Sequence, residues 1–147
     1  MAGDVFSKAK RSQVMSRIRG HGNKDTELVL MKLLRLHHIT GWRRNQKIYG
    51  KPDFIFKGNR LAIFVDGCFW HGCRRCYRRP KSNQKYWDLK VIRNRTRDRR
   101  VNSALRKVGW QVLRIWEHEL AAKGDRAVHR VVKSLITSHP RLQSSSR

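Results

Sequence analysis

Two aspartates interrupt apolar runs in the middle of the chain. Asp53 lies in PDFIF, residues 52–56, and Asp66 ends LAIFVD, residues 61–66. An acid inside an apolar strand carries a desolvation cost unless a partner compensates it. A divalent cation is such a partner, because Mg²⁺ binds carboxylate oxygens and stabilises the oxygens of a displacement at phosphorus. The sequence therefore predicts a Mg²⁺ site at Asp53.

A second Mg²⁺ ligand is expected on the run that follows. In many metal-dependent nucleases, Pro-Asp on the first strand of a hairpin supplies one ligand and the second strand supplies another. Here Val65 offers only its backbone carbonyl, whereas Asp66 offers a carboxylate. Neighbouring strand residues point to opposite faces, so at most one of them reaches the ion unless the strand bulges.

Three further residues could take part in catalysis. His71 is the expected proton carrier, because imidazole titrates near neutral pH and this residue follows the second strand closely. Asp98 shares the inward face of a predicted helix with Trp87, eleven residues earlier. Asp98 either orients His71 or pairs with an arginine on a solvated face, and both interpretations stay open. For Glu27 we favour an acid stabilised by a helix N-terminus.

Three cysteines lie within nine residues, as Cys68-x4-Cys73-x2-Cys76. Their odd number argues against a disulfide framework, and their spacing is typical of a structural zinc site, which needs four ligands. His71 and His118 could each supply the fourth, and we favour His118 because it follows a strand that can neighbour residues 61–66. Zinc would then stabilise the long loop over residues 67–80. The alternative is a set of buried apolar cysteines.

The composition indicates a polyanionic partner. The chain has 147 residues, with 35 Lys and Arg against 10 Asp and Glu, a formal net charge of +25. Nucleic acid is the leading partner, because neutralising phosphates releases counterions; a protein that merely coats RNA stays open on charge alone. We find no long apolar span and no secretory apolar segment in MAGDVFSKAKRSQ, so we expect a cytoplasmic protein that does not bind membranes.

The predicted elements alternate in a way typical of an α/β sandwich. Gly58-Asn59 favours a two-residue hairpin turn, and Gly109 favours a helix end. The strand that follows the long helix should pair in parallel with an earlier strand, as helical crossovers favour. We expect a basic arm over 1–22, one domain over 23–138 and a polar tail over 139–147. The expected helices span 7–19, about 23–38, 83–107 and 125–137, and the expected strands span 42–49, 52–56, 61–66 and 110–116.

Several runs together resemble the very-short-patch-repair (Vsr) mismatch endonucleases. The similar segments cover about residues 7–120 and are KRSQVMSRIRGHGNKDTELVLMKLL, GKPDFIF, LAIFVDGCFWHGC, YWDLK, RDRR and GWQVLRIWEHEL. The resemblance implies a fold like that of restriction endonucleases, a central mixed sheet flanked by helices with a structural zinc site. It also implies Mg²⁺-dependent nicking of duplex DNA 5′ to the thymine of a T·G mismatch. The implied protein is a monomer acting on bacterial nucleoid DNA.

The resemblance also implies roles for particular residues. Asp53 becomes the metal-binding carboxylate, His71 the catalytic histidine and Asp98 its partner, while Glu27 lies near the metal waters. An aromatic wedge would enter the base stack beside the mismatch, where unstacking costs least. Core packing is the alternative for these aromatic residues. They are Phe69, Trp70 and Trp87.

The chain also departs from the family pattern. Better-known members carry Thr-His where this chain has Val65-Asp66, and a cysteine where it has His118. A carboxylate at position 66 makes the site similar to that of an ordinary two-carboxylate nuclease. Two other functions therefore stay open: a sequence-specific restriction- or homing-type endonuclease, and a non-catalytic zinc-stabilised DNA-binding module.

Overall fold

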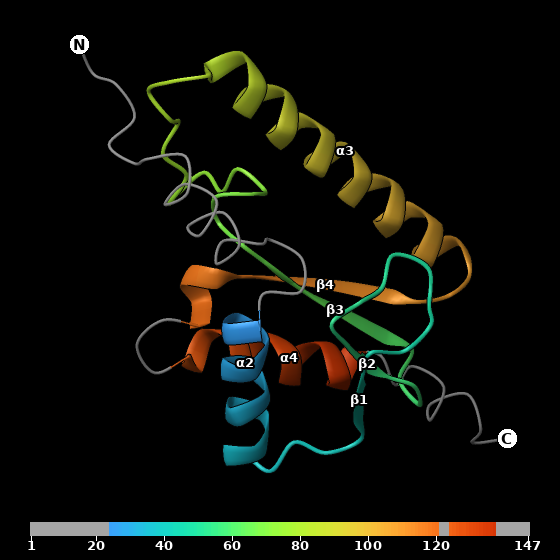
Figure 1. Cartoon of the computed structure of the whole chain (residues 1–147). Helices are drawn as coiled ribbons and strands as arrows, with labels where there is room; N and C mark the ends of the chain where they lie inside the picture. The colour runs from blue at the N-terminus through green and yellow to red at the C-terminus, as the bar shows by residue number, and fades with distance from the viewer. Residues whose placement is uncertain (1–23, 121–123, 138–147) are drawn as a thin grey trace, which may run out of the picture.

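The computed structural model of the protein describes residues 24–120 and 124–137 (Figure 1). The helix expected over residues 7–19, the arm over 1–22 and the tail over 139–147 lie outside this part of the chain. The expected order of the remaining elements is confirmed: one helix, three strands, a long helix, a strand and a last helix.

The described chain forms one mixed four-stranded sheet, in the order β1-β2-β3-β4. The first three strands are antiparallel, and β4 pairs in parallel with β3. This confirms the parallel return, which the crossover through the long helix makes possible. The strands are β1 Trp42–Arg44, β2 Phe54–Phe56, β3 Leu61–Asp66 and β4 Gln111–Trp116.

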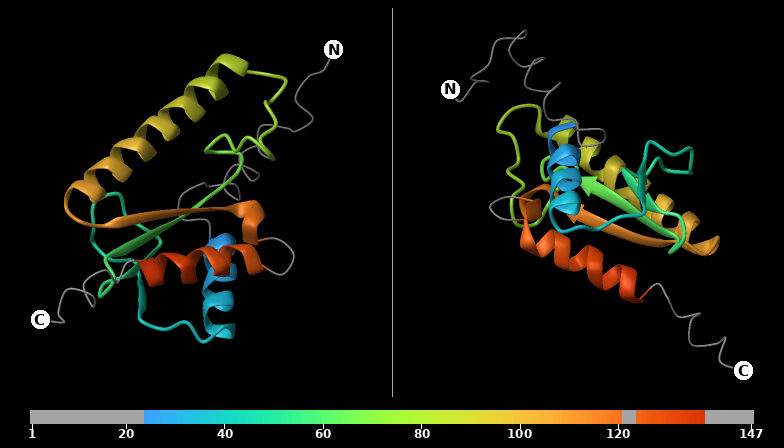
Figure 2. Two further views of the ribbon diagram at one scale, coloured as in Figure 1. Left: turned by 180° about the vertical axis from the view of Figure 1, so that it is seen from behind. Right: turned by 90° about the horizontal axis from the view of Figure 1, so that it is seen from below.

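Helices cover both faces of the sheet (Figures 1 and 2). On one face, α2 (Lys24–Leu36) and α4 (Asp125–Thr137) pack on Phe54, Ile63, Val65 and their neighbours. On the other, α3 (Gln84–Lys107) packs through Val101 and Leu105 on Ala62 and Phe64. Strand alternation divides these residues between the faces, and it places the side chain of Asp66 on the α3 side with Ala62 and Phe64. A short 3₁₀ turn, Glu117–Leu120, links β4 towards α4.

Two expected strands are shorter than predicted. The strand expected over 42–49 ends at Arg44, because the backbone takes a left-handed conformation at the next residue, Asn45. The strand expected over 52–56 begins at Phe54, after Pro52, which has no N–H to donate. The segment between β1 and β2 is therefore a loop.

The expected two-residue turn at Gly58-Asn59 is also wrong. Phe56 pairs with Leu61, so the connection has the four residues 57–60, and Arg60 takes the positive φ. The predicted end of the long helix agrees with the structure. Gly109 follows α3 with a φ of +89°, and Trp87, Asn94 and Asp98 lie on its inner side as the helical period requires.

Candidate active site

Asp53 lies at the start of β2 and is only 7% exposed. Its Oδ2 accepts a hydrogen bond from the Val65 N–H at 2.7 Å, and its own N–H donates to the Ile63 carbonyl at 2.9 Å. Burial raises the pKa of Asp53 to about 8; the Val65 N–H opposes this shift, and Glu27 and Asp66 add to it. Among the described residues no lysine or arginine forms an ion pair with this carboxylate, so a cation would relieve its burial.

Glu27 comes from the first turns of α2 and is also buried, at 7% exposure. Arg44 of β1 donates from Nη2 to Glu27 Oε2 at 2.8 Å, and its guanidinium carbon lies 5.6 Å from the centre of the Phe54 ring. The favoured interpretation of Glu27 as a mere helix N-terminal acid is therefore incomplete. The residue pairs with β1 and raises the pKa of Asp53.

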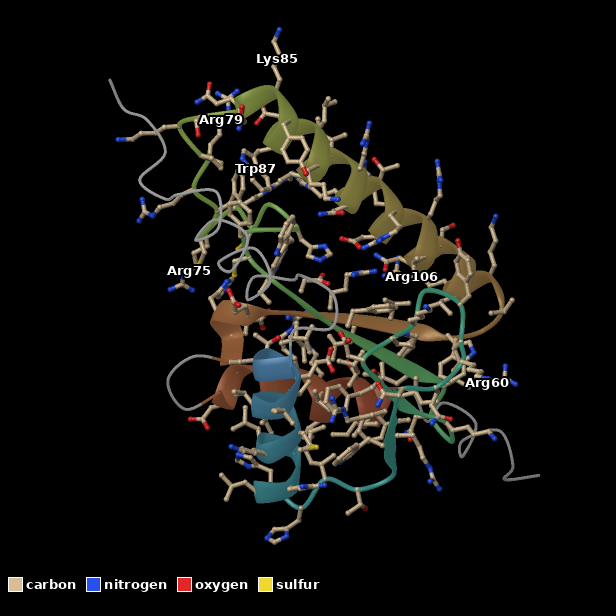
Figure 3. The ribbon with its side chains drawn as sticks, in the orientation of Figure 1. Arg60, Arg75, Arg79, Lys85, Trp87 and Arg106 are labelled. Atoms are coloured by element: carbon tan, nitrogen blue, oxygen red, sulfur yellow. The ribbon has the colours of Figure 1, made fainter. Side chains whose placement is uncertain are left out.

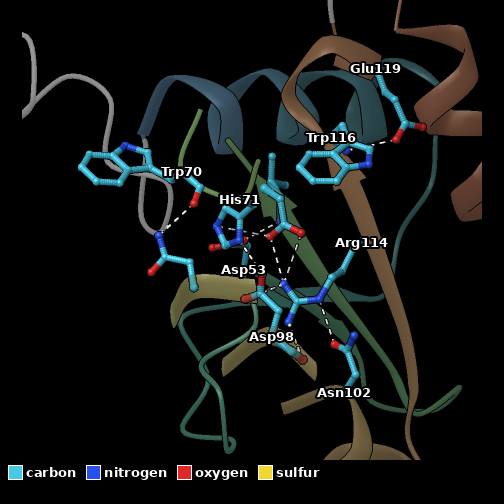
Figure 4. Close-up of polar contacts among 11 residues, drawn as sticks. Asp53, Trp70, His71, Asp98, Asn102, Arg114, Trp116 and Glu119 are labelled. Atoms are coloured by element: carbon cyan, nitrogen blue, oxygen red, sulfur yellow. Dashed lines mark hydrogen bonds and ion pairs between the residues drawn. The ribbon is translucent and has the colours of Figure 1, made fainter. Parts of the chain in front are cut away.

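His71 and Asp98 form the second part of the site. The imidazole is buried, and its Nδ1 lies 2.5 Å from Asp98 Oδ2 (Figure 4). An ionised carboxylate only accepts hydrogen bonds, so Nδ1 carries a proton. Nε2 then faces Asp66 Oδ1 at 3.8 Å. Of the two interpretations of Asp98, the structure thus favours the partner of His71 over a solvated arginine pair.

The charges around Asp98 outweigh its burial. Burial by itself raises the pKa of Asp98, but the hydrogen bond and charge of His71, with the charges of Arg114 and Arg97, lower it below its usual value. For Asp66 burial is the larger effect: it raises the pKa of Asp66, although the charges of His71 and Arg114 oppose the shift. Asp98 therefore stays ionised beside the imidazole.

Arg114, a residue not predicted from the sequence, joins these groups from β4. Its Nη1 lies 3.0 Å from Asp66 Oδ1, 3.2 Å from Asp66 Oδ2 and 3.4 Å from Asp98 Oδ1. Its Nε donates to Asn102 at 2.8 Å, and its guanidinium carbon lies 4.2 Å from the centre of the Phe64 ring. An arginine inside the strand sequence QVLRIW was the available signal, because β3 carries an equally isolated acid.

Three cysteines and one histidine meet beside this site. Their ligand atoms all lie within 4.8 Å of one another, with His118 Nδ1 3.4 Å from Cys68 Sγ and 3.5 Å from Cys73 Sγ. Burial raises the pKa of the Cys68 thiol to about 12, and the nearby Cys73 and Cys76 add to the shift. Three thiols and one imidazole are a donor set that fits tetrahedral zinc. The cluster includes His118 and leaves His71 out, as expected.

The three expected wedge residues form one aromatic cluster at the α3 side of the cysteine loop. Phe69 lies 5.5 Å from Trp70 and 5.3 Å from Trp87, between ring centres. Trp87 is 9% exposed and points from α3 to the loop (Figure 3). Phe69 and Trp70, on the loop itself, are half-buried. Asn94 of α3 also donates to the Trp70 carbonyl at 2.8 Å. The alternative of core packing thus describes Trp87 best.

Comparison with known proteins points to one family. The family model described as DNA mismatch endonuclease Vsr matches residues 3–78. The chain is 40% identical over 115 residues to the type II nicking enzyme V.NaeI of Lentzea aerocolonigenes, covering 76% of this chain and 69% of that protein. It is 36% identical over 124 residues to the DNA mismatch endonuclease Vsr of Escherichia coli, covering 82% and 77%.

One solved structure shares the fold. The catalytic domain of the homing endonuclease I-Bth0305I aligns with a TM-score of 0.54 and 23% identity, over 78% of this chain and 96% of that one. At this identity the likeness concerns the fold alone, and it agrees with the expected central mixed sheet flanked by helices. No described helix is both long and apolar enough to cross a membrane.

Proposed function

Since this chain belongs to the family of DNA mismatch endonuclease Vsr, we propose that it nicks one DNA strand 5′ to the thymine of a T·G mismatch, with Mg²⁺ held at Asp53. The protein is a DNA endonuclease, which removes the alternative of a non-catalytic binding module. The observation that carries the proposal is the continuity of the site. The N–H of Val65, the neighbour of Asp66 in β3, binds Asp53 Oδ2 at 2.7 Å, and Asp66 Oδ1 lies 3.8 Å from His71 Nε2, while His71 Nδ1 binds Asp98.

The carboxylate of Asp53 suits a hard divalent cation. Mg²⁺ at this position would stabilise the charge that develops on the attacking and leaving oxygens at phosphorus. The second ligand would be the Val65 carbonyl or the Asp66 carboxylate, and the Arg114 contacts favour Val65 because both oxygens of Asp66 already face a guanidinium. Substituting Asp66→Asn should then slow nicking without changing the Mg²⁺ concentration that gives half the maximal rate. A large increase in that concentration would instead make Asp66 a metal ligand.

His71 would move the proton. With Nδ1–H held by Asp98, its Nε2 is the nitrogen that can take a proton from the attacking water. Asp98 fixes the tautomer and stabilises the imidazolium once the proton has been transferred, as the orienting acid does in a hydrolase triad. Glu27 lies beside Asp53 and would orient water at the cation through hydrogen bonds.

The aromatic cluster supports selectivity for a mismatch. Phe69 and Trp70 are half-buried and lie on the loop that also carries His71, while Trp87 supports them from α3. Inserting such rings between bases costs a few kcal/mol per unstacked step, and less where pairing is already defective. We therefore expect Trp70→Ala to lower the preference for T·G over T·A more than it lowers the maximal nicking rate.

The proposed site also includes a structural zinc ion. Cys68, Cys73, Cys76 and His118 would hold it, and it would stabilise the loop between β3 and α3. The relatives compared above are bacterial, and we expect a monomer that acts on DNA in the bacterial cytoplasm.

A nicking assay tests the proposal. Two duplexes identical except for one T·A or T·G pair are incubated with the protein, with and without Mg²⁺, and the nicked strand is mapped. We expect nicking of the T·G duplex only, and only with Mg²⁺. Asp53→Ala should abolish nicking and leave DNA affinity unchanged or higher, because the variant cannot place an ionised carboxylate near the phosphates.

A matched substitution provides the control, and two outcomes contradict the proposal. Asp88→Asn removes an exposed acid that pairs with Arg79, so it should nick at the wild-type rate. Equal nicking of the T·A and T·G duplexes at a particular sequence would favour the sequence-specific endonuclease instead. Nicking that persists in the Asp53→Ala variant would refute the metal site.

A further inference from the structure

Beside the His71–Asp98 pair lies a hollow that the proposed catalytic roles do not use. It has a volume of about 320 Å³ and opens between the loop before β2, the inner side of α3 and the sheet. We propose that it binds one backbone phosphate of the DNA, next to the phosphodiester that is cut. This inference rests on the protein's action on DNA. The lining residues are Gly50, Lys51, Phe64, Arg97, Asp98, Val101 and Arg114.

The charges of the lining favour an anion. Three cations from three different elements line the hollow: Lys51 from the loop, Arg97 from α3 and Arg114 from β4. They outnumber the two carboxylates there, Asp98 in the lining and Asp66, which Arg114 binds at 3.0 Å. The Asp98 carboxylate already binds His71 at 2.5 Å and Arg114 at 3.4 Å. A phosphate would therefore meet a net positive surface.

Two of the cations have no acidic partner in the described part of the chain. Within the described residues, neither Lys51 nor Arg97 forms an ion pair or a side-chain hydrogen bond, although the charge of Arg97 lowers the pKa of Asp98. Both side chains are exposed. By contrast, Arg79 and Arg130 each bind a carboxylate oxygen, at 2.7 Å and 2.5 Å. Lys51 and Arg97 are therefore available for a phosphate.

The backbone holds Lys51 in place over the hollow. Gly50 packs so closely on α3 that a Cβ there would lie 2.3 Å from Val101 Cγ1, and its φ is +82°. Lys51 follows with a φ of +51° and donates its N–H to the Ile48 carbonyl at 2.9 Å. The ring of the next residue, Pro52, fixes its own φ and so restricts the backbone there. The loop is thus seated on the helix, which reduces the entropy lost when the lysine binds.

The position relative to His71 suggests which phosphate is bound. Asp98 both lines the hollow and binds the imidazole, so the hollow begins one side chain away from the proposed proton carrier. Successive phosphates of one strand are about 3.4 Å apart along the helix axis. A phosphate within a few nucleotides of the cut would therefore occupy the hollow while the cut phosphodiester lies at His71.

The salt dependence of DNA binding tests the inference. Affinity for a T·G duplex is measured without Mg²⁺, so that no nicking occurs, for the wild type and for the double variant Lys51→Gln, Arg97→Gln. Losing one phosphate contact should lower the slope of log affinity against log salt by about 0.9. The affinity gap to wild type should then narrow about 3.5-fold between roughly 50 and 200 mM salt. The control is Arg126→Gln, Lys133→Gln, which removes two exposed cations from α4 on the opposite face of the sheet.

Duplexes with one uncharged methylphosphonate locate the contact. In the wild type, one position near the nick should weaken binding strongly, and in the double variant the same position should have little further effect, because the two changes remove one interaction. A slope equal to that of the control variant, or equal effects at every position, would overturn the inference. Nicking at saturating DNA is measured separately, so loss of the phosphate site is distinguished from loss of the Mg²⁺ chemistry.

Discussion

Replacing Asp98 by asparagine should disable proton transfer while preserving the shape of the site. Asp98 Oδ2 accepts the Nδ1–H of a histidine that is only 4% exposed. An asparagine of the same size can donate to Nδ1 instead, which places the proton on Nε2, where it prevents His71 from acting as a base. A correctly placed proton carrier contributes a factor of about 10²–10⁴ in rate, or roughly 3–5 kcal/mol. The nicking rate should fall by this factor.

The assay is single-turnover nicking of a T·G duplex with the protein in excess, which isolates the chemical step from product release. DNA affinity should stay the same or increase, because the variant carries one negative charge fewer near the phosphates. Asp88→Asn is the matched control on the same helix, where the side chain is 40% exposed and pairs with Arg79. An Asp98→Asn rate within about threefold of wild type would refute the role of the His71–Asp98 pair, provided that a melting curve shows the variant folded.

Four further predictions concern the cations and the loop. Burial raises the pKa of Asp53 to about 8, so below pH 8 the binding of Mg²⁺ must displace a proton from this carboxyl. The apparent Mg²⁺ affinity should therefore rise up to about tenfold per pH unit towards pH 8 and then level off. Titrating Mg²⁺ against the nicking rate at each pH measures this affinity. Without Mg²⁺, the free energy of unfolding should fall as pH rises from about 4 to about 8, since the folded chain then holds a proton that the unfolded chain has lost; a flat profile would contradict the raised pKa. Cys73→Ser should lose zinc in a metal analysis and unfold roughly 8 °C lower, for a loss of about 2 kcal/mol, whereas unchanged zinc content would exclude this ligand. Gly72→Ala should slow nicking and lower the melting temperature, because a Cβ at φ +62° would lie 2.6 Å from Val91 Cγ1 and displace the loop beside His71; a wild-type rate would show that the loop tolerates the shift.

Local patterns in the sequence were enough to predict the type and position of most helices and strands. The strand at 61–66 and the helix at 125–137 have the predicted bounds, because apolar runs and helical periodicity are properties of neighbouring residues. The loop between β1 and β2 was predicted less well. The strand expected over 42–49 stops at Arg44, because the left-handed conformation at Asn45 ends the pairing.

The sequence by itself determined the chemistry that is available: a buried acid at Asp53, a thiol cluster with defined spacing and a large excess of positive charge. Only the tertiary structure decided which groups meet. The crossover through α3 brings β4 alongside β3, so Arg114 reaches Asp66 across 48 residues of sequence. The same pairing carries His118, which the sequence only favoured over His71, to Cys68 across 50 residues. The physical reason is that such contacts depend on strand register and helix packing over the whole sheet, which no local pattern of residues encodes.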